Sequence, residues 1–114
     1  MDKNFNEVKA GDKLYTVSFN KITYEIILRE EKVSKVNKIN DNIISFETED
    51  GNYLPVSNIF KPNTTQERLV IDTNIFTNKD DALNYCRRLR DTELYILRRK
   101  IESIEKQINI LLKF

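Results

Sequence analysis

The chain of 114 residues has no histidine, no tryptophan and a single cysteine, Cys86. One cysteine cannot form an intramolecular disulfide, and this fits a reducing cytoplasm. Without histidine or a second cysteine, zinc and most transition metals lack their preferred ligands, and Cys86 has no imidazole to activate its thiol. We therefore expect no metal, no cofactor and no thiol chemistry, and we interpret Cys86 as a buried helix residue.

Glycine and proline are scarce as well, with two residues of each. Gly11 and Gly51 lie far apart in the sequence, so the chain has no glycine-rich phosphate loop, and this excludes nucleotide hydrolysis of the P-loop type. No stretch approaches the roughly 18 apolar residues of a membrane span, and the first residues, MDKNFNEVKAGDK, lack the apolar segment of a signal peptide. These absences predict a cytoplasmic protein, in the host cytoplasm if a phage encodes it, with no membrane partner.

Residues 1–76 carry the pattern of short β-strands. β-Branched and aromatic residues alternate with polar ones, turn signals such as Asp50-Gly51 separate the runs, and Pro55 ends a strand or places it at a sheet edge. Residues 1–10 are polar and predict a mobile start, although Phe5 and Val8 could dock on this body. The expected strands are 14–19, 22–28, 33–39, 43–48, 53–54 and 69–71, with a polar loop at 61–67. They predict a small antiparallel sheet or a partly open barrel.

Residues 77–114 contain neither glycine nor proline and predict helix. Thr77 is the expected N-cap, with Asp80 completing a capping box. Two apolar faces follow, and they do not join in register near Asp91-Thr92. We therefore favour two helical segments over one long helix, with Thr92 or Asp91 as the cap of the second segment. The first face is Ala82, Tyr85, Cys86 and Leu89, and the second is a heptad seam of Leu94, Leu97, Ile101, Ile104, Ile108 and Leu111.

The helical region is long for so small a protein. A continuous helix over its 38 residues would extend about 57 Å, further than the β-rich part of the chain can cover. A second copy of the chain is the expected partner for the uncovered part. The sequence thus predicts a single α+β domain over 1–114, with a β-rich part at 1–76 and a helical, oligomerising part at 77–114 that pairs as a coiled coil.

A cluster of arginines stands out in the helical region. Residues 87–100 carry a net charge of +4, and guanidinium groups match the oxygens of phosphate in pairs. A solvated helix face with intrahelical ion pairs, such as Arg87 with Asp91, is the ordinary alternative. The candidate ligand residues from this cluster are Arg88, Arg98 and Arg99.

Aromatic and amide residues surround the start of the helix. Phe76 offers a stacking face, the Asn84 amide can recognise a base or a ribose, and free N–H groups of the helix N-terminus can bind an anion. The alternatives are that Phe76 closes the core under the helix and that Asn74 and Asn78 only shape the turn. Together with the arginines, these residues predict a site for a small nucleotide-type ligand.

No catalytic constellation is evident. Carboxylates such as Glu30-Glu31 and Glu47 have no basic partner at a meaningful spacing, so acid–base catalysis is not expected. Tyr15, Tyr24 and Tyr53 could form an aromatic platform for single-stranded nucleic acid, with a core position as the alternative for Tyr24. We therefore expect a binding protein and no enzyme.

Two segments carry a resemblance to known proteins: the Gly11–Tyr15 start, GDKLY, and the junction Phe76–Ala82, FTNKDDA. The chain resembles a broad group of small phage and mobile-element proteins with a sheet and a C-terminal helix, and within it the phage anti-Thoeris sponge proteins. Those proteins form oligomers and hold glycocyclic ADP-ribose signals between subunits without cleaving them. By residue type and neighbourhood, the resemblance implies ligand binding by Phe76, Asn84, Arg88, Arg98 and Arg99.

The function implied by this resemblance is non-catalytic sequestration of a cyclic ADP-ribose-type immune signal at a subunit interface, which would inhibit host defence. Two alternatives from other classes stay open. One is an inhibitor or adaptor that binds a host protein through the helix or an exposed sheet edge. The other is a small nucleic-acid-binding module, whose affinity would fall steeply with salt.

Overall fold

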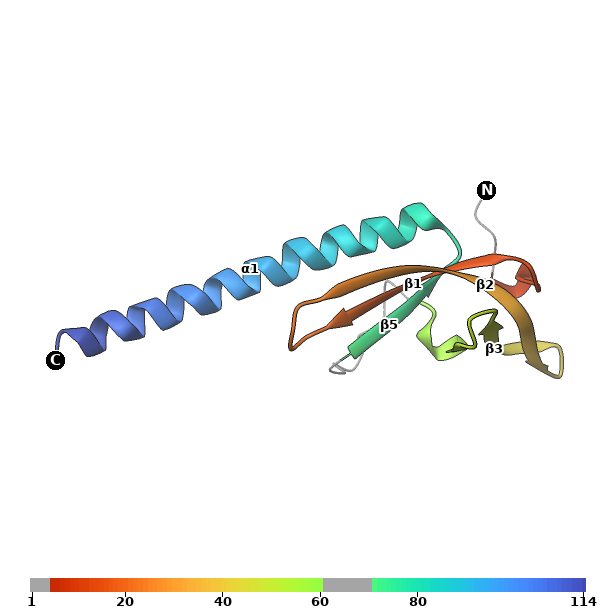
Figure 1. Cartoon of the computed structure of the whole chain (residues 1–114), viewed down its shortest axis with the longest axis horizontal. Helices are drawn as coiled ribbons and strands as arrows, with labels where there is room; N and C mark the ends of the chain where they lie inside the picture. Colours follow the sequence, from red (N-terminus) through yellow and green to blue (C-terminus); the bar gives the residue numbers. More distant parts are fainter. Residues whose placement is uncertain (1–4, 61–70) are drawn as a thin grey trace.

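The computed structural model describes residues 5–60 and 71–114. They form a five-stranded antiparallel sheet, in the order β4-β3-β2-β1-β5, followed by one long helix (Figure 1). The predicted α+β class is confirmed. The elements are η1 (Phe5–Glu7), β1 (Lys13–Asn20), β2 (Ile26–Ile39), β3 (Asn42–Thr48), β4 (Tyr53–Pro55), η2 (Val56–Asn58), β5 (Ile71–Phe76) and α1 (Lys79–Leu112).

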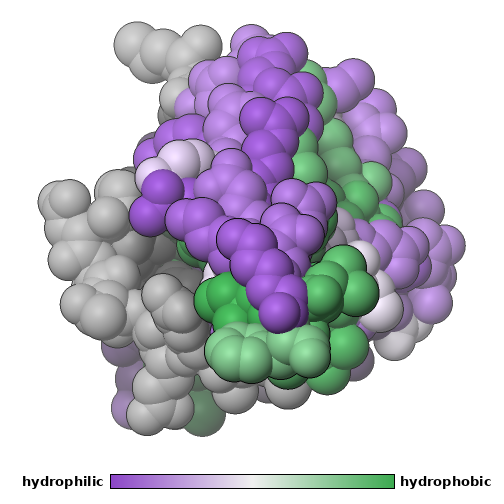
Figure 2. Space-filling view, turned by 90° about the vertical axis from the view of Figure 1, so that its left-hand side faces the viewer, coloured by the Kyte–Doolittle hydropathy of each residue, from purple (hydrophilic) through white to green (hydrophobic). Residues whose placement is uncertain are grey.

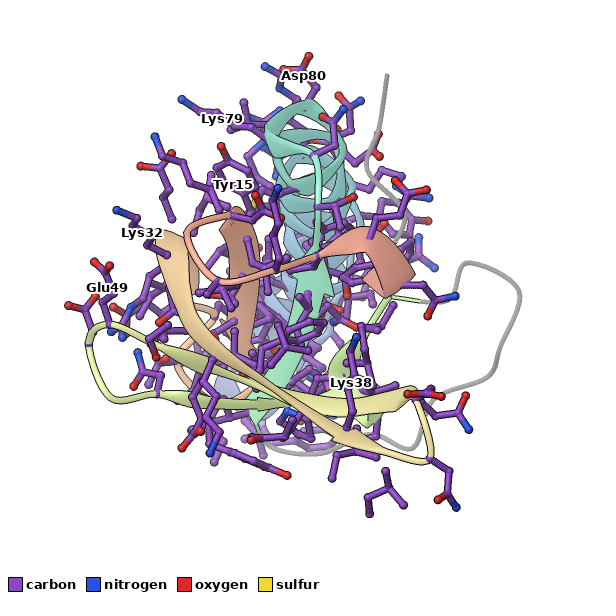
Figure 3. The ribbon with its side chains drawn as sticks, turned by 90° about the vertical axis from the view of Figure 1, so that its right-hand side faces the viewer. Tyr15, Lys32, Lys38, Glu49, Lys79 and Asp80 are labelled. Carbon is purple, nitrogen blue, oxygen red and sulfur yellow. The ribbon has the colours of Figure 1, made fainter. Side chains whose placement is uncertain are left out.

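The long strand β2 gives the sheet its curled, half-barrel shape. It pairs with β1 through residues 26–32 and with β3 through residues 33–39, and the second ladder shifts register between Val33 and Lys35. Such irregularities bend a strand and increase its twist. Figure 3 shows the result, with Lys32 on one arm of β2 and Lys38 on the other. At the far edge, the short strand β4 ends at Pro55, as predicted.

Two apolar clusters pack on opposite faces of the sheet. Because side chains alternate along a strand, the neighbours Ile75 and Phe76 face opposite ways. Ile75 packs inside the curl, where Val8 is buried and the Phe5 ring lies 6.4 Å from that of Phe46. Docking of this pair is the alternative to a mobile start that the sequence left open. Phe76 packs on the other face, under the helix.

The predicted strand 22–28 is wrong over its first four residues. β2 begins at Ile26, and residues 21–24 form the hairpin loop instead. The side chain of Asn20 accepts hydrogen bonds from the backbone N–H groups of Ile22 and Thr23, at 2.9 and 3.1 Å, and Tyr24 takes a left-handed conformation with φ 61°. This local turn chemistry overrides the apolar alternation and leaves Ile22 72% exposed.

Two expectations about the helix are also corrected. α1 is continuous, so Asp91 and Thr92 lie within it, and the carboxylate of Asp91 accepts a hydrogen bond from Arg90 at 3.1 Å rather than capping a second segment. The N-cap is Asn78 and not Thr77. Its side-chain oxygen accepts from the backbone N–H groups of Asp80 and Asp81, at 2.7 and 3.3 Å.

Only the first two thirds of α1 lies against the sheet. Ala82 is fully buried, Tyr85, Cys86 and Leu89 pack around it, and the last contact is the hydrogen bond from Lys100 Nζ to Tyr24 Oη, at 3.3 Å. Every residue from 101 to 114 is exposed. The protein is therefore elongated, 67 Å by 28 Å by 26 Å, with a helical rod that projects past the sheet (Figure 1).

No helix within the described residues is long and apolar enough to cross a membrane. The predicted polar loop at 61–67, and Leu69 and Val70 of the last predicted strand, fall outside the described residues. The remainder of that strand is confirmed and extended as β5.

The position of the cap can be tested by stability. Asn78→Ala removes the acceptor for two N–H groups and should lower the free energy of unfolding by about 1 kcal/mol. Thr77→Ala is the matched control and should change it by less than about 0.5 kcal/mol. Urea unfolding of both variants at equal protein concentration measures the difference, and a larger loss for Thr77→Ala would contradict the assignment.

Candidate functional site

A pocket of about 470 Å³ lies where β5 meets the start of α1. Its apolar wall consists of Phe5, Phe60, Ile75 and Phe76, and its polar wall of Thr77, Asp81, Asn84 and Arg88. The last three residues fall on one side of the helix because they are spaced by three and four. The volume is in the range of pockets that hold small molecules.

Three aromatic rings form one group beside this pocket. The ring centroids of Phe60 and Phe76 are 5.2 Å apart and the two rings are stacked, while Tyr85 lies 4.8 Å from Phe60 and 5.4 Å from Phe76. Phe76 is only 5% exposed and packs with Val17, so its ordinary interpretation, closing the core under the helix, is confirmed. Phe60 is half-buried and offers the larger ring surface to a ligand.

Arg88 sits at the rim of the aromatic group. Its guanidinium carbon lies 5.7 Å from the centroid of the Phe60 ring and 5.9 Å from that of Tyr85, within the range of cation–π contacts. Arg88 also lines a second pocket of about 290 Å³, shared with Phe60 and Thr92. Among the described residues no carboxylate lies within ion-pair distance of Arg88, so its charge faces both pockets.

A buried hydrogen bond supports the aromatic group from below. The side chain of Asn74, which is 2% exposed, donates to Tyr85 Oη at 3.1 Å. Burial raises the pKa of the Tyr85 hydroxyl above its ordinary 10.0, the charge of Asp72 adds to this, and the charge of Arg88 opposes it. Asn74 therefore positions Tyr85 and is not accessible to a ligand.

Cys86 follows Tyr85 on the helix face that meets the sheet. It is half-buried, and burial raises the pKa of its thiol. In the part of the chain that the structure describes, no three acidic or cysteine side chains gather as metal ligands would.

The N-terminus of α1 does not provide the anion site that the sequence led us to expect. The side chain of Asn78 already occupies the N–H groups of Asp80 and Asp81, and the carboxylates of these two residues place negative charge at the same end of the helix. Figure 3 shows Lys79 and Asp80 at this end, pointing away from the sheet. A phosphate group would be repelled there.

The five predicted ligand residues separate into two groups. Phe76, Asn84 and Arg88 line the same pocket. Arg98 and Arg99 are not among the lining residues, because ten residues of helix carry Arg98 about 15 Å further along the axis. Arg99 instead lies over the ring of Tyr95, at 6.0 Å.

Sequence reasoning missed Phe60 and Asp81 as parts of the pocket. Asp81 carried a signal, since it is three residues before Asn84 and seven before Arg88 and so shares their helix face. Phe60 carried none, because it lies outside any regular pattern. It reaches the pocket because the segment after η2 runs back to β5, where Phe60 N donates to the carbonyl of Ile75 at 3.3 Å.

Comparisons of the chain with protein-family models, with curated proteins and with solved structures gave no match. The resemblance to the anti-Thoeris sponge proteins therefore stays a prediction.

The hydrogen bond under the pocket leads to a prediction about pH. Tyr85→Phe leaves the Asn74 amide without this acceptor and should cost about 1 kcal/mol of unfolding free energy at pH 7. The raised pKa means that the folded state favours the neutral hydroxyl, so the contribution of Tyr85 is complete below pH 10 and is lost as the pH rises above it.

Urea unfolding at pH 7 and at pH 11 should therefore show a smaller difference between the wild type and Tyr85→Phe at the higher pH. Tyr95→Phe, at an exposed tyrosine of the same helix, is the control and should have little effect at pH 7. A difference for Tyr85→Phe that grew with pH would contradict the assignment.

Proposed function

We propose that the chain is a non-catalytic binding protein that captures a nucleotide-derived ligand in the 470 Å³ pocket at the junction of β5 and α1. We also propose that it acts as a homo-oligomer joined through α1. One observation carries the ligand part of this proposal. Phe76, Asn84 and Arg88, selected from the sequence for nucleotide chemistry, line one pocket together with a second phenylalanine, Phe60.

The chemistry of the pocket suits a nucleotide better than a purely apolar ligand. A base can lie against the half-buried ring of Phe60, and stacking of this kind contributes about 1–3 kcal/mol per base. Asp81 can accept a hydrogen bond from an exocyclic amine, and the Asn84 amide can donate one, since its oxygen already accepts from Arg87 at 3.2 Å. Arg88 is left to hold a phosphate group.

Capture fits these groups better than conversion. The chain has no histidine to transfer protons near neutral pH, and the pocket offers one carboxylate, one amide, one hydroxyl and one guanidinium. The role that we propose from the resemblance is sequestration of a cyclic ADP-ribose-type immune signal. One protomer by itself brings Phe76, Asn84 and Arg88 together, and we propose that these three residues provide its contacts to the ligand.

The oligomer part of the proposal depends on the projecting rod. Seam residues Ile101, Ile104, Ile108 and Leu111 are 47%, 56%, 50% and 73% exposed. Figure 2, which looks along the helix from its C-terminal end, shows apolar side chains gathered on one side of the rod and polar ones on the other. Continuous apolar surface of this kind marks an interface, and the heptad spacing fits a second copy of the same helix.

Native mass spectrometry tests both parts. We expect an oligomer that retains one member of a panel of cyclic ADP-ribose isomers and cyclic dinucleotides with its mass unchanged. Arg88→Gln should weaken the binding of that ligand about tenfold or more, because a hydrogen bond to a charged group contributes about 1.5–3 kcal/mol. Arg99→Gln, outside the pocket on the same helix, is the matched control and should bind as the wild type does.

Binding to no member of the panel would overturn the ligand part. Equal losses of ligand affinity in Arg88→Gln and Arg99→Gln would show that the ligand is attracted by the overall positive charge of the helix and does not bind at the pocket. A released product of altered mass would overturn the non-catalytic assignment.

The exposed rod also supports a second candidate function, an inhibitor or adaptor that presents its apolar seam to a host protein. Residues 101–114 would then bind a groove in that protein as an amphipathic helix does. A monomer in native mass spectrometry, together with a stable complex that is lost in Ile104→Asp, would favour this candidate.

A further inference from the structure

We propose that two copies of α1 pair in parallel and in register, as a two-stranded coiled coil over residues 94–114. This inference rests on the self-association proposed above and adds its direction and register. Seam residues Leu94, Ile101 and Ile108 occupy the a positions of the heptad, and Leu97, Ile104 and Leu111 occupy the d positions. Isoleucine at a and leucine at d favour parallel dimers, and two of three residues of each kind follow that preference.

The seam is free to pair while α1 stays on its own sheet. The residues nearest the sheet on this part of the helix include Glu93, Ile96 and Lys100, which line a cavity with Phe19 of β1. Leu94 and Ile101 come one position after Glu93 and Lys100, about 100° further around the axis, and are 42% and 47% exposed. Leu97 lies between the two faces and is half-buried. One face of α1 thus packs on the sheet while the neighbouring face is open to a partner.

Charges beside the seam are complementary in the parallel arrangement. In a parallel dimer, each g residue faces the e residue five positions later in the other helix. This brings Glu93 next to the partner's Arg98 and Lys100 next to the partner's Glu105, and symmetry repeats both pairs. Lys100 can take part while bonded to Tyr24, because its ammonium group has three donors.

The antiparallel arrangement with the same seam uses fewer of these charges. It pairs Leu94 with the partner's Leu111 and Ile101 with the partner's Ile104. Arg98 then meets the partner's Glu105, but Lys100 meets the partner's Gln107 and Glu93 meets the partner's Phe114. The number of opposite-charge contacts falls from four to two in the dimer, and glutamate carboxylates are placed against phenylalanine rings.

The C-terminal end of the rod also favours the parallel arrangement. Ile110, Leu111, Leu112 and Phe114 are 56%, 73%, 78% and 102% exposed, so apolar side chains surround the end of the helix. A parallel dimer places these residues next to the same residues of the partner. The antiparallel dimer places Leu112 opposite the partner's Asp91 and Phe114 opposite the partner's Glu93, where apolar burial would desolvate charge.

Cysteine cross-linking tests the direction. In a Cys86→Ala background, oxidation of Leu111→Cys should link two protomers, because matching d positions lie next to each other in a parallel dimer. Asn109→Cys, on the outward face, is the matched control and should not cross-link. In an antiparallel dimer the two residues 111 would be about 25 Å apart and could not react.

A mixture of Leu94→Cys and mass-tagged Leu111→Cys protomers completes the experiment. Links between residues 94 and 111 would overturn the parallel direction while leaving self-association and ligand capture intact. A wild-type monomer at micromolar concentration would overturn self-association and this inference together, whereas ligand binding is measured separately in native mass spectra.

A charge reversal tests the register. Lys100→Glu places a glutamate next to the partner's Glu105 in both of the symmetry-related g–e pairs. This repulsion should raise the dimer dissociation constant on the order of threefold to tenfold. Adding Glu105→Lys should restore it. Glu102→Lys, at an outer b position, is the control, and failure of the double variant to recover would overturn the register.

Discussion

The close packing of Ala82 on Phe76 and Val17 determines how the rest of the molecule is arranged. Ala82 is fully buried, and its small side chain allows the first turns of α1 to approach the sheet closely. This contact sets the direction of the helix across β1 and β5. It also positions Asn84 and Arg88, two and six residues later, beside the aromatic rings of Phe60 and Phe76.

The same packing explains why so much of the helix is uncovered. The sheet ends at the hairpin loop that contains Tyr24, and α1 extends far past this loop (Figure 1). The long side chain of Lys100 still donates a hydrogen bond to Tyr24 Oη, at 3.3 Å. Beyond it, α1 has twelve more residues, from Ile101 to Leu112, and no sheet beneath them. An isolated helix of that length is poorly stable in water, because most helices gain their stability by packing an apolar face. The exposed isoleucines and leucines of this segment have nothing to pack against within the protomer.

Much of the fold could be predicted from the sequence, because its signals are local. The alternation of apolar and polar residues, together with Pro55 and the turn Asp50-Gly51, indicated the sheet. The absence of glycine and proline from residues 77–114 indicated the helix. The prediction of two helical segments failed for a physical reason. The faces of Ala82 and of Leu94 do not join in register because only the Ala82 face packs on the sheet, and not because the helix breaks.

The candidate site was predictable only where its residues are close together in the sequence. Phe76 is the last residue of β5, and Asn84 and Arg88 follow on consecutive turns of α1, so proximity in sequence implied proximity in space. Phe60 comes from a distant segment and could not be placed without the fold. Arg98 and Arg99 were predicted as ligand residues from the local density of positive charge, which says nothing about position along the helix axis. The rise of about 15 Å from Arg88 to Arg98 is too large for one small ligand to bridge easily.

Continuity of α1 links the two proposed surfaces. A rigid helix through Asp91 and Thr92 means that pairing at the seam also fixes where the pockets lie. Arg88 is six residues before Leu94 and thirteen before Ile101, so at 100° per residue it points more than 90° away from the seam. In the parallel dimer that we propose, the two pockets would therefore face away from the seam.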